Sequence, residues 1–415
     1  MKNWKIIIGL VLALGATVAQ AAITVPGADG SDGALLITEN TQIDLSLATT
    51  GAWDDAGTGN GVYDSNKWAV VFKYSSVVVT NGATLTFANH PSRAPVVWLV
   101  NGDVTILGTV NLDGQGSMPR YSNIHAEGGP GGFRGGLGDA TGLSRSAGLG
   151  VGGGRTDFSY THGAGGSYGT VGENNTAAAY GNPSLIPLIG GSGGAGSNSG
   201  DCGGAGGGAI LIAATQAITL NGTIRAIGGA GISYNAEDSG SGSGGGIRLV
   251  SDSLSGTGSI IAYGNTAYWD GGEGRIRVER VTNDGNFSIS PDPSVLGLES
   301  GATALLWPPA GAPEVRIVSV GGVSIPGDPR ASFGAYGADA ALPQTNSTQI
   351  VVETTNVESA SQVLVRLTPR HSGTYAQYAA TLSATNNLDP LVLRWIAQPT
   401  VKIGYSAVQV RVVRP

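Results

Sequence analysis

Four side chains in the glycine-rich middle of the sequence are the best suited to chemistry: Arg155, Asp157, His162 and Asp201. An imidazole and a carboxylate exchange protons with a substrate, and a guanidinium holds the carboxylate of a sugar acid. If these groups converge, they predict the site of a polysaccharide lyase or glycoside hydrolase. An active site needs these side chains close together in space, and their spacing along the sequence does not show this. We therefore favour a second interpretation, in which the four residues are polar loop residues that hydrogen-bond exposed backbone.

Two short motif matches lack the context that their chemistry needs. Residues 190–194 fit G-x-S-x-G, but glycine and serine surround them where a nucleophile elbow has a strand and a helix. Residues 148–153 fit G-x-G-x-x-G outside any βαβ unit. Both matches are therefore attributed to chance in a glycine-rich segment.

Two aromatic residues, Tyr268 and Trp269, are candidates for stacking on sugar rings. They fall in the segment 265–271, which is expected to be an exposed loop. Trp98 lies in a continuous apolar run and is expected in the core. The sequence therefore indicates Tyr268 and Trp269 as ligand-binding candidates.

Two acidic pairs near the start are candidates for calcium: Asp29 with Asp32, and Asp54 with Asp55. Calcium favours several oxygen ligands from carboxylates and backbone carbonyls. Neither pair matches an EF-hand loop, and aspartates between glycines also stabilise turns through their own side chains. Calcium binding and turn formation are thus both open for these residues, and no other cofactor is expected.

Charge and cysteine content exclude some classes of protein. The 415 residues carry 22 Lys+Arg against 29 Asp+Glu, a net charge of −7, and no basic stripe. Nucleic acid is therefore not an expected partner. A single cysteine, Cys202, permits no internal disulfide and is expected as a small buried residue.

The first 21 residues have the pattern of a secretory signal peptide. Lys2 and Lys5 precede an apolar run over 6–18, and Ala19-Gln20-Ala21 fits the small-x-small cleavage rule. We expect a mature chain from Ala22 that is secreted or held at the bacterial cell surface. No later apolar run reaches about 18 residues, so no transmembrane span is expected in the mature protein.

Short sequence motifs recur in the chain, and each is bounded or preceded by glycines. GTVNLDG at 108–114 returns as GTIRAIG at 222–228 and GSIIAYG at 258–264. GGGAILI at 206–212 returns as GGGIRLV at 244–250 and GEGRIRV at 272–278. Repeats of this kind predict a solenoid in which each coil buries its apolar side against the next.

Glycine divides the chain, since 47 of the 70 glycines lie between residues 111 and 280. We expect a glycine-rich right-handed parallel β-helix over 22–280, interrupted by an insertion at about 115–204. Residues 281–314 contain five prolines and are expected as a linker. Strands alternating with period two over 315–415 predict a small antiparallel β-sandwich.

The insertion has two interpretations. The favoured one is a set of irregular loops along one solenoid face, pinned by Phe133, Phe158, Tyr160 and Tyr168. The other is a set of packed, extended glycine helices, in which missing side chains allow close backbone approach.

The phrases over 206–278, together with 68–116, resemble the glycine-rich secreted β-helix proteins of environmental bacteria of planctomycete and verrucomicrobia type. The resemblance covers about two-thirds of the mature chain. It implies a secreted or surface-exposed right-handed β-helix, the fold of the broader pectin-lyase-like superfamily. That superfamily includes polysaccharide lyases and hydrolases, but no motif here matches their catalytic residues.

We therefore expect a non-enzymatic structural or adhesive protein whose partner is extracellular polysaccharide or the cell envelope. The alternative is a polysaccharide lyase or glycoside hydrolase with a site near the insertion. A third hypothesis is an ice- or surface-binding solenoid, which needs a flat, regular array of threonines or of Asp/Asn residues. Thr109 and Thr223 align in the repeats, whereas Ser259 breaks the pattern.

Overall fold

Parallel and antiparallel strands account for nearly all the regular structure of the chain. The computed structural model describes residues 22–53, 58–140, 143–157, 159, 161–234, 236–330, 337–343, 347–371 and 373–415. Within these residues the only helix is a short 3-10 turn, η1 (Leu45–Thr49). The all-β class expected from the sequence is confirmed. None of the described helical segments has the length and apolar character to cross a membrane.

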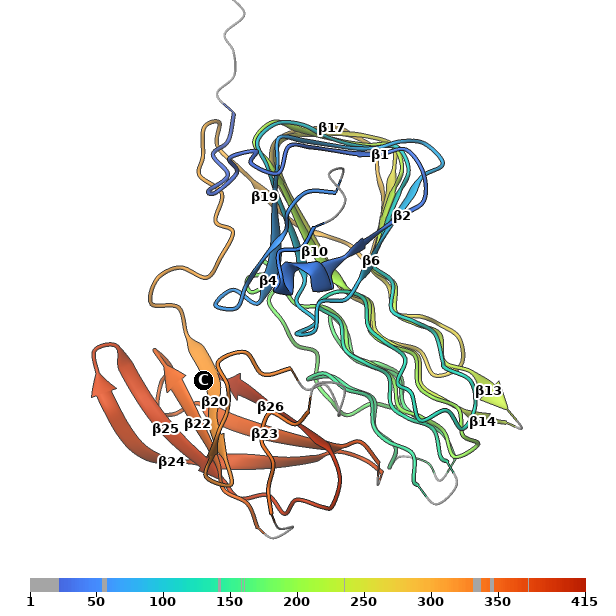
Figure 1. Ribbon diagram of the computed structural model, residues 1–415, viewed down its shortest axis with the longest axis vertical. Coiled ribbons are helices and arrows are strands. Elements are labelled where there is room, and N and C mark those ends of the chain that lie inside the picture. Colours follow the sequence, from blue (N-terminus) through green and yellow to red (C-terminus); the bar gives the residue numbers. More distant parts are fainter. Residues whose placement is uncertain are drawn as a thin grey trace, which may run out of the picture.

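Parallel strands form three faces of a stack, hereafter the strand stack (Figure 1). The first face contains β4 (Ala69–Tyr74), β7 (Val96–Val100), β10 (Ala209–Ala214), the first halves of β15 (Gly246–Gly256) and β17 (Arg275–Gly285), and β19 (Ser294–Gly297). The second contains β1 (Ala34–Ile37), β5 (Ser76–Val79), β8 (Val104–Ile106), β11 (Ala217–Leu220) and the second halves of β15 and β17. The third contains β2 (Thr41–Asp44), β6 (Thr84–Ala88), β9 (Thr109–Asn111), β12 (Thr223–Arg225), β16 (Ser259–Ile261) and β18 (Ser288–Ser290). A short strand, β3 (Val62–Asp64), pairs antiparallel with β4.

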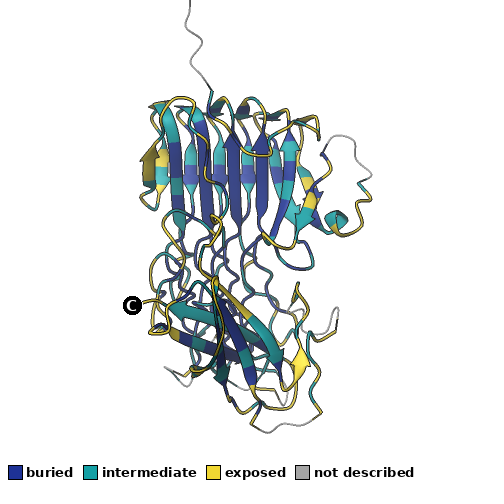
Figure 2. Cartoon of the chain, turned by 90° about the vertical axis from the view of Figure 1, so that its left-hand side faces the viewer, coloured by how far each residue is buried: buried dark blue, intermediate teal, exposed yellow. Residues whose placement is uncertain are grey.

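The repeated phrases lie in register on these faces. Ile210 pairs with Ile247 and Ile247 with Ile276, while Ile224 pairs with Ile260. These side chains belong to one buried apolar cluster inside the stack, and the strands are mostly buried in Figure 2. Parallel pairing requires each strand to present matching apolar residues to the same interior, which explains the repeats.

The outer side of the first face is also buried. Ile23 and Leu306, from segments before and after the stack, cover apolar residues of β7, β10 and β15. Beneath them the buried Arg248 and Glu279 form an ion pair of 2.9 Å. The carbonyl of Leu305 accepts a hydrogen bond from the Arg248 guanidinium, so this buried charge is fully engaged.

Three glycine-rich segments, 112–208, 226–245 and 262–274, connect third-face strands to the next turn of the stack. They run side by side as extended backbone, hereafter the glycine bundle, with one small hairpin of β13 (Ser233–Tyr234) and β14 (Glu237–Asp238) (Figure 1). Successive N–H groups donate to different neighbours with a period of three. Residues 203 and 206 donate to carbonyls in 133–136, 204 and 207 to carbonyls in 240–243, and 205 and 208 to carbonyls in 112–115. Three residues per turn is the repeat of a polyproline II helix.

The interpretation favoured from the sequence, irregular loops, is therefore wrong, and the alternative of packed extended glycine helices agrees with the structure. An added Cβ at Gly204 would lie 2.0 Å from the Gly229 oxygen, which leaves no room for a side chain. Of the expected pins, Tyr168 is fully buried and Phe133 packs against Leu149. The other two, at 158 and 160, lie outside the described residues.

The C-terminal body is an antiparallel sheet in the order β21-β20-β22-β25-β24-β23-β26. Its strands are β20 (Glu314–Val320), β21 (Val323–Ser324), β22 (Ile350–Thr355), β23 (Gln362–Pro369), β24 (Ala376–Leu388), β25 (Leu391–Ala397) and β26 (Ser406–Val413). The first part of β24 pairs with β23 and the rest with β25, so the sheet curls around a core containing Trp395. Trp395 is buried, and its indole N–H donates to the Thr354 hydroxyl at 2.9 Å.

The segment expected as a linker, 281–314, begins with strands. The end of β17, β18 and β19 all pair into the strand stack, which extends to Gly297. Ala304 and Leu306 then pack onto the stack's first face. The connection to β20 is consequently shorter than the proline pattern indicates.

Candidate functional site

The four residues proposed for catalysis have three different sets of partners. Arg155 contacts Asp157 at 3.7 Å, close to it in sequence. His162 instead faces Asp238, with 3.5 Å between imidazole Nδ1 and carboxylate and the Asp238 N–H donating to the same Nδ1 at 3.1 Å. The structure thus pairs Arg155 with Asp157 and gives His162 a carboxylate that sequence analysis did not single out.

Asp201 has a different set of partners. It is 1% exposed, accepts a hydrogen bond of 2.6 Å from the Ser199 hydroxyl, and lies 3.5 Å from the Arg120 guanidinium. The neighbouring Cys202 is buried and free, and burial raises the pKa of its thiol. A buried thiol with a raised pKa is a poor nucleophile, which agrees with the packing role expected for Cys202.

The two aromatic candidates differ in exposure. Tyr268 is 53% exposed and adopts a left-handed backbone with φ of 64°. Trp269 is half-buried and meets the His162 ring edge-on at 5.3 Å. Tyr268 therefore offers its surface to solvent, while Trp269 packs within the bundle.

The first calcium candidates form turns. The Asp29 carboxylate accepts the Ser31 N–H at 3.0 Å and pairs with Lys73 at 2.7 Å, and the hydrogen bond from Lys73 lowers the pKa of Asp29. Asp32 accepts the Lys73 backbone N–H at 2.6 Å. Asp54 and Asp55 lie outside the described residues. Within the described part of the chain, no group of three or more His, Cys, Asp or Glu side chains is arranged to hold a metal ion.

His125 is a buried histidine of the bundle that gives a pH-dependent prediction. Its Nδ1 donates to the Gly135 carbonyl at 2.7 Å, and burial lowers the pKa of its imidazole to about 4. The unfolded chain protonates this imidazole below about pH 6.5, whereas the folded chain does so only below about pH 4. The stability that is present above about pH 6.5 should therefore decrease as the pH falls to about 4.

For His125→Gln, we expect stability close to that of the wild type at about pH 7 and a loss about 2 kcal/mol smaller on acidification to about pH 4.5. Urea denaturation midpoints at the two pH values measure this difference. Equal losses for variant and wild type would exclude His125 as a source of the acid sensitivity.

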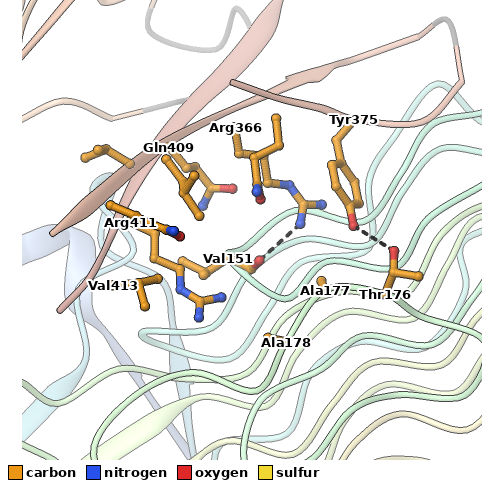
Figure 3. Close-up of a pocket in the computed structure, with 13 residues that line it drawn as sticks. Val151, Thr176, Ala177, Ala178, Arg366, Tyr375, Gln409, Arg411 and Val413 are labelled. Carbon is orange, nitrogen blue, oxygen red and sulfur yellow. Dashed lines mark hydrogen bonds between the residues drawn. The ribbon is translucent and has the colours of Figure 1, made fainter. Parts of the chain in front are cut away.

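A groove that sequence analysis missed lies between the glycine bundle and the C-terminal body (Figure 3). Its volume is about 440 Å³, within the usual range for ligand sites. One wall is formed by bundle residues 151 and 176–178, and the other is the face of β23, β24 and β26 that points to the bundle. The polar side chains among its lining residues are Thr176, Gln362, Arg366, Tyr375, Gln377, Gln409 and Arg411.

Arg366 anchors one side of this groove. It is 5% exposed, and its guanidinium donates to the carbonyls of Gly148, Val151 and Gly153 at 3.1–3.2 Å. It also lies 3.5 Å over the Tyr375 ring, whose hydroxyl is 3.5 Å from that of Thr176. Burial lowers the pKa of Arg366 to about 10, so it stays charged at neutral pH.

A second cavity, of about 480 Å³, lies where the third face of the stack meets the bundle. Glu127 accepts hydrogen bonds from both Arg93 and Arg134 at 2.8 Å, and burial raises the pKa of Glu127. Asp113, which also lines this cavity, pairs with Arg225, so the carboxylates of the lining are already in ion pairs.

A column of hydroxyls follows the outer side of the third face. The aligned residues Thr109 and Thr223 continue in register to Thr84 on one side and to Ser259 and Ser288 on the other. Ser259 thus keeps a hydroxyl in the column but lacks the methyl group that a threonine array presents.

The chain matches no model of a protein family, no curated protein and no solved structure.

Proposed function

We propose that this chain is a secreted or cell-surface protein with a structural and adhesive role, which binds extracellular polysaccharide without turning it over. We also propose that its strand stack is a right-handed parallel β-helix of pectin-lyase-like form, and that its C-terminal body is a small β-sandwich. The three-faced parallel pairing and the curled antiparallel sheet support these two assignments.

The proposal rests on one observation, the continuous backbone hydrogen bonding that joins the stack to the bundle. Gly208 donates to the Leu112 carbonyl and Gly246 to the Gly208 carbonyl, at 2.8 and 2.9 Å, so bundle segments continue the ladder of the strands. Close-packed backbone leaves little free volume and resists deformation. A framework of this kind suits a protein that holds surface groups at fixed spacing.

Catalysis by a polysaccharide lyase or glycoside hydrolase is the alternative. The four candidate side chains would then have to act together, although they contact three different sets of partners. Cooperation between an acid and a base requires both within reach of one substrate atom, which favours the non-catalytic role.

The test incubates the chain from Ala22 onward with insoluble polysaccharides and isolated cell envelopes, with and without calcium. We expect it to sediment with at least one of these materials and to release neither reducing ends nor unsaturated sugars. A heat-unfolded sample controls for non-specific adsorption. Product release would contradict the non-catalytic role, and failure to sediment with every material would contradict adhesion.

A further inference from the structure

The groove between the glycine bundle and β23, β24 and β26 carries a charge unlike that of the whole chain. Its lining residues include Arg366 and Arg411 and no aspartate or glutamate. The chain itself has a net charge of −7. A site with two guanidinium groups and no carboxylate attracts an anion.

Arg411 is the guanidinium that is open to a ligand. It is half-buried on β26, and its side chain takes part in none of the ion pairs of the described residues. Many other arginines do pair with carboxylates, as Arg93, Arg248 and Arg316 do. Figure 3 shows Arg411 directed into the groove beside Val413. Its planar donors match a carboxylate or a sulfate.

Amide side chains line the groove beside this charge. Arg366 pairs across the sheet with Gln377 on one side and Gln409 on the other, so the three side chains form one row on the same face. Arg411 lies in the adjacent row, opposite Leu364. Amides both donate and accept hydrogen bonds, as sugar hydroxyls require.

One polar atom of this row lacks a partner. The Gln409 Oε1 is buried and accepts no hydrogen bond from the described residues. A buried acceptor is normally satisfied, so the Gln409 amide would gain a hydrogen bond by turning its Oε1 toward a hydroxyl in the groove.

The opposite wall completes a saccharide site. Val151, Ala177 and Ala178 present small apolar groups, and the Tyr375 ring lies at one end, held by Arg366. A sugar ring carries C–H groups on its faces and hydroxyls on its rim, so it matches apolar walls together with an amide floor.

We propose that this groove binds an anionic saccharide, with the carboxylate or sulfate of one sugar unit on Arg411 and its hydroxyls on Gln377 and Gln409. This inference rests on the proposed polysaccharide-binding function and names the class of polymer and the place where it binds.

The test measures calorimetric binding of the chain from Ala22 onward to oligogalacturonate, to sulfated dextran oligosaccharide and to unmodified dextran oligosaccharide. We expect binding of one or both anionic ligands, weakening as salt concentration rises, and none of the neutral dextran. The two anionic arms distinguish a carboxylate from a sulfate as the preferred group.

Arg411→Gln should weaken anionic binding about 10- to 100-fold, since one charge-assisted bidentate contact is lost. Arg316→Gln is the matched control: it removes an exposed arginine of the same body that lies outside the groove, and it should bind like the wild type. Unchanged hydrogen-exchange protection over β23 and β26 verifies that Arg411→Gln remains folded.

Equal binding by Arg411→Gln and the wild type, or equal binding of neutral and anionic ligands, would overturn the groove assignment. Sedimentation with polysaccharide in that case would leave the adhesive function intact. Loss of both sedimentation and oligosaccharide binding would contradict the function itself, so the two failures are distinguishable.

Discussion

Gly204→Ala is expected to destabilise the folded protein by about 3 kcal/mol or more, the upper end for overpacking a core. The new Cβ would lie 2.0 Å from the Gly229 oxygen and 2.6 Å from its carbonyl carbon, and both atoms are backbone. A flexible side chain can rotate away from such a contact, whereas a backbone held by hydrogen bonds cannot. The Gly229 segment is itself fixed, because its N–H donates to Ala205 at 2.7 Å.

The measurement is the midpoint of chemical denaturation, with amide hydrogen exchange to locate the damage in the bundle. Gly297→Ala is the matched control, since a Cβ there meets nothing within 4 Å and the residue is exposed. It should change stability by less than about 0.5 kcal/mol. Similar stabilities for Gly204→Ala and Gly297→Ala would show that the bundle is not close-packed.

The strands of both bodies follow from the sequence because their apolar residues repeat. The runs at 96–100 and 362–367 coincide with β7 and with most of β23. The strand β24 is harder to recognise in the sequence. None of its residues is fully buried, and it ends in the exposed residues Asn386, Asn387 and Leu388, so an apolar face is only weakly marked.

The glycine bundle is harder to predict from the sequence. Its period of three is seen in the directions of successive N–H groups, and glycine has no side chain whose type could show that period in the sequence. Composition therefore predicted a close backbone approach as one of two interpretations, and only the hydrogen bonds decide between them.

The groove could not be predicted because its walls come from distant parts of the chain. Val151 and Arg366 are 215 residues apart, and each is an ordinary residue of its own segment. The only sequence signal is an arginine in an otherwise apolar alternation over 363–367, which reads as a solvent-facing side chain. The C-terminal body packs against the bundle and buries the face of β23 that carries Arg366. The local sequence pattern does not predict this packing.

Arg366→Met is expected to cost about 3 kcal/mol and to loosen the C-terminal body from the bundle. The methionine fills a similar volume but leaves three carbonyls, those of Gly148, Val151 and Gly153, without the guanidinium that they bind. Each lost hydrogen bond to a charged group is worth about 1.5–3 kcal/mol, and relaxation recovers part of the sum. Arg366→Lys keeps the charge but loses the planar fork, so an intermediate loss is expected.

Hydrogen exchange distinguishes this effect from general unfolding. In Arg366→Met, protection should fall over 148–153 and over the facing strand β23, while β10 inside the strand stack keeps its protection. Arg414→Met is the control, because Arg414 pairs with the exposed Glu358 and a fully exposed ion pair adds little to stability. Unchanged exchange over 148–153 in Arg366→Met would mean that other contacts hold the two bodies together, such as the pairing of Ser146 with Gly373. In that case the groove would keep its shape without Arg366, and Arg411 alone would determine its charge.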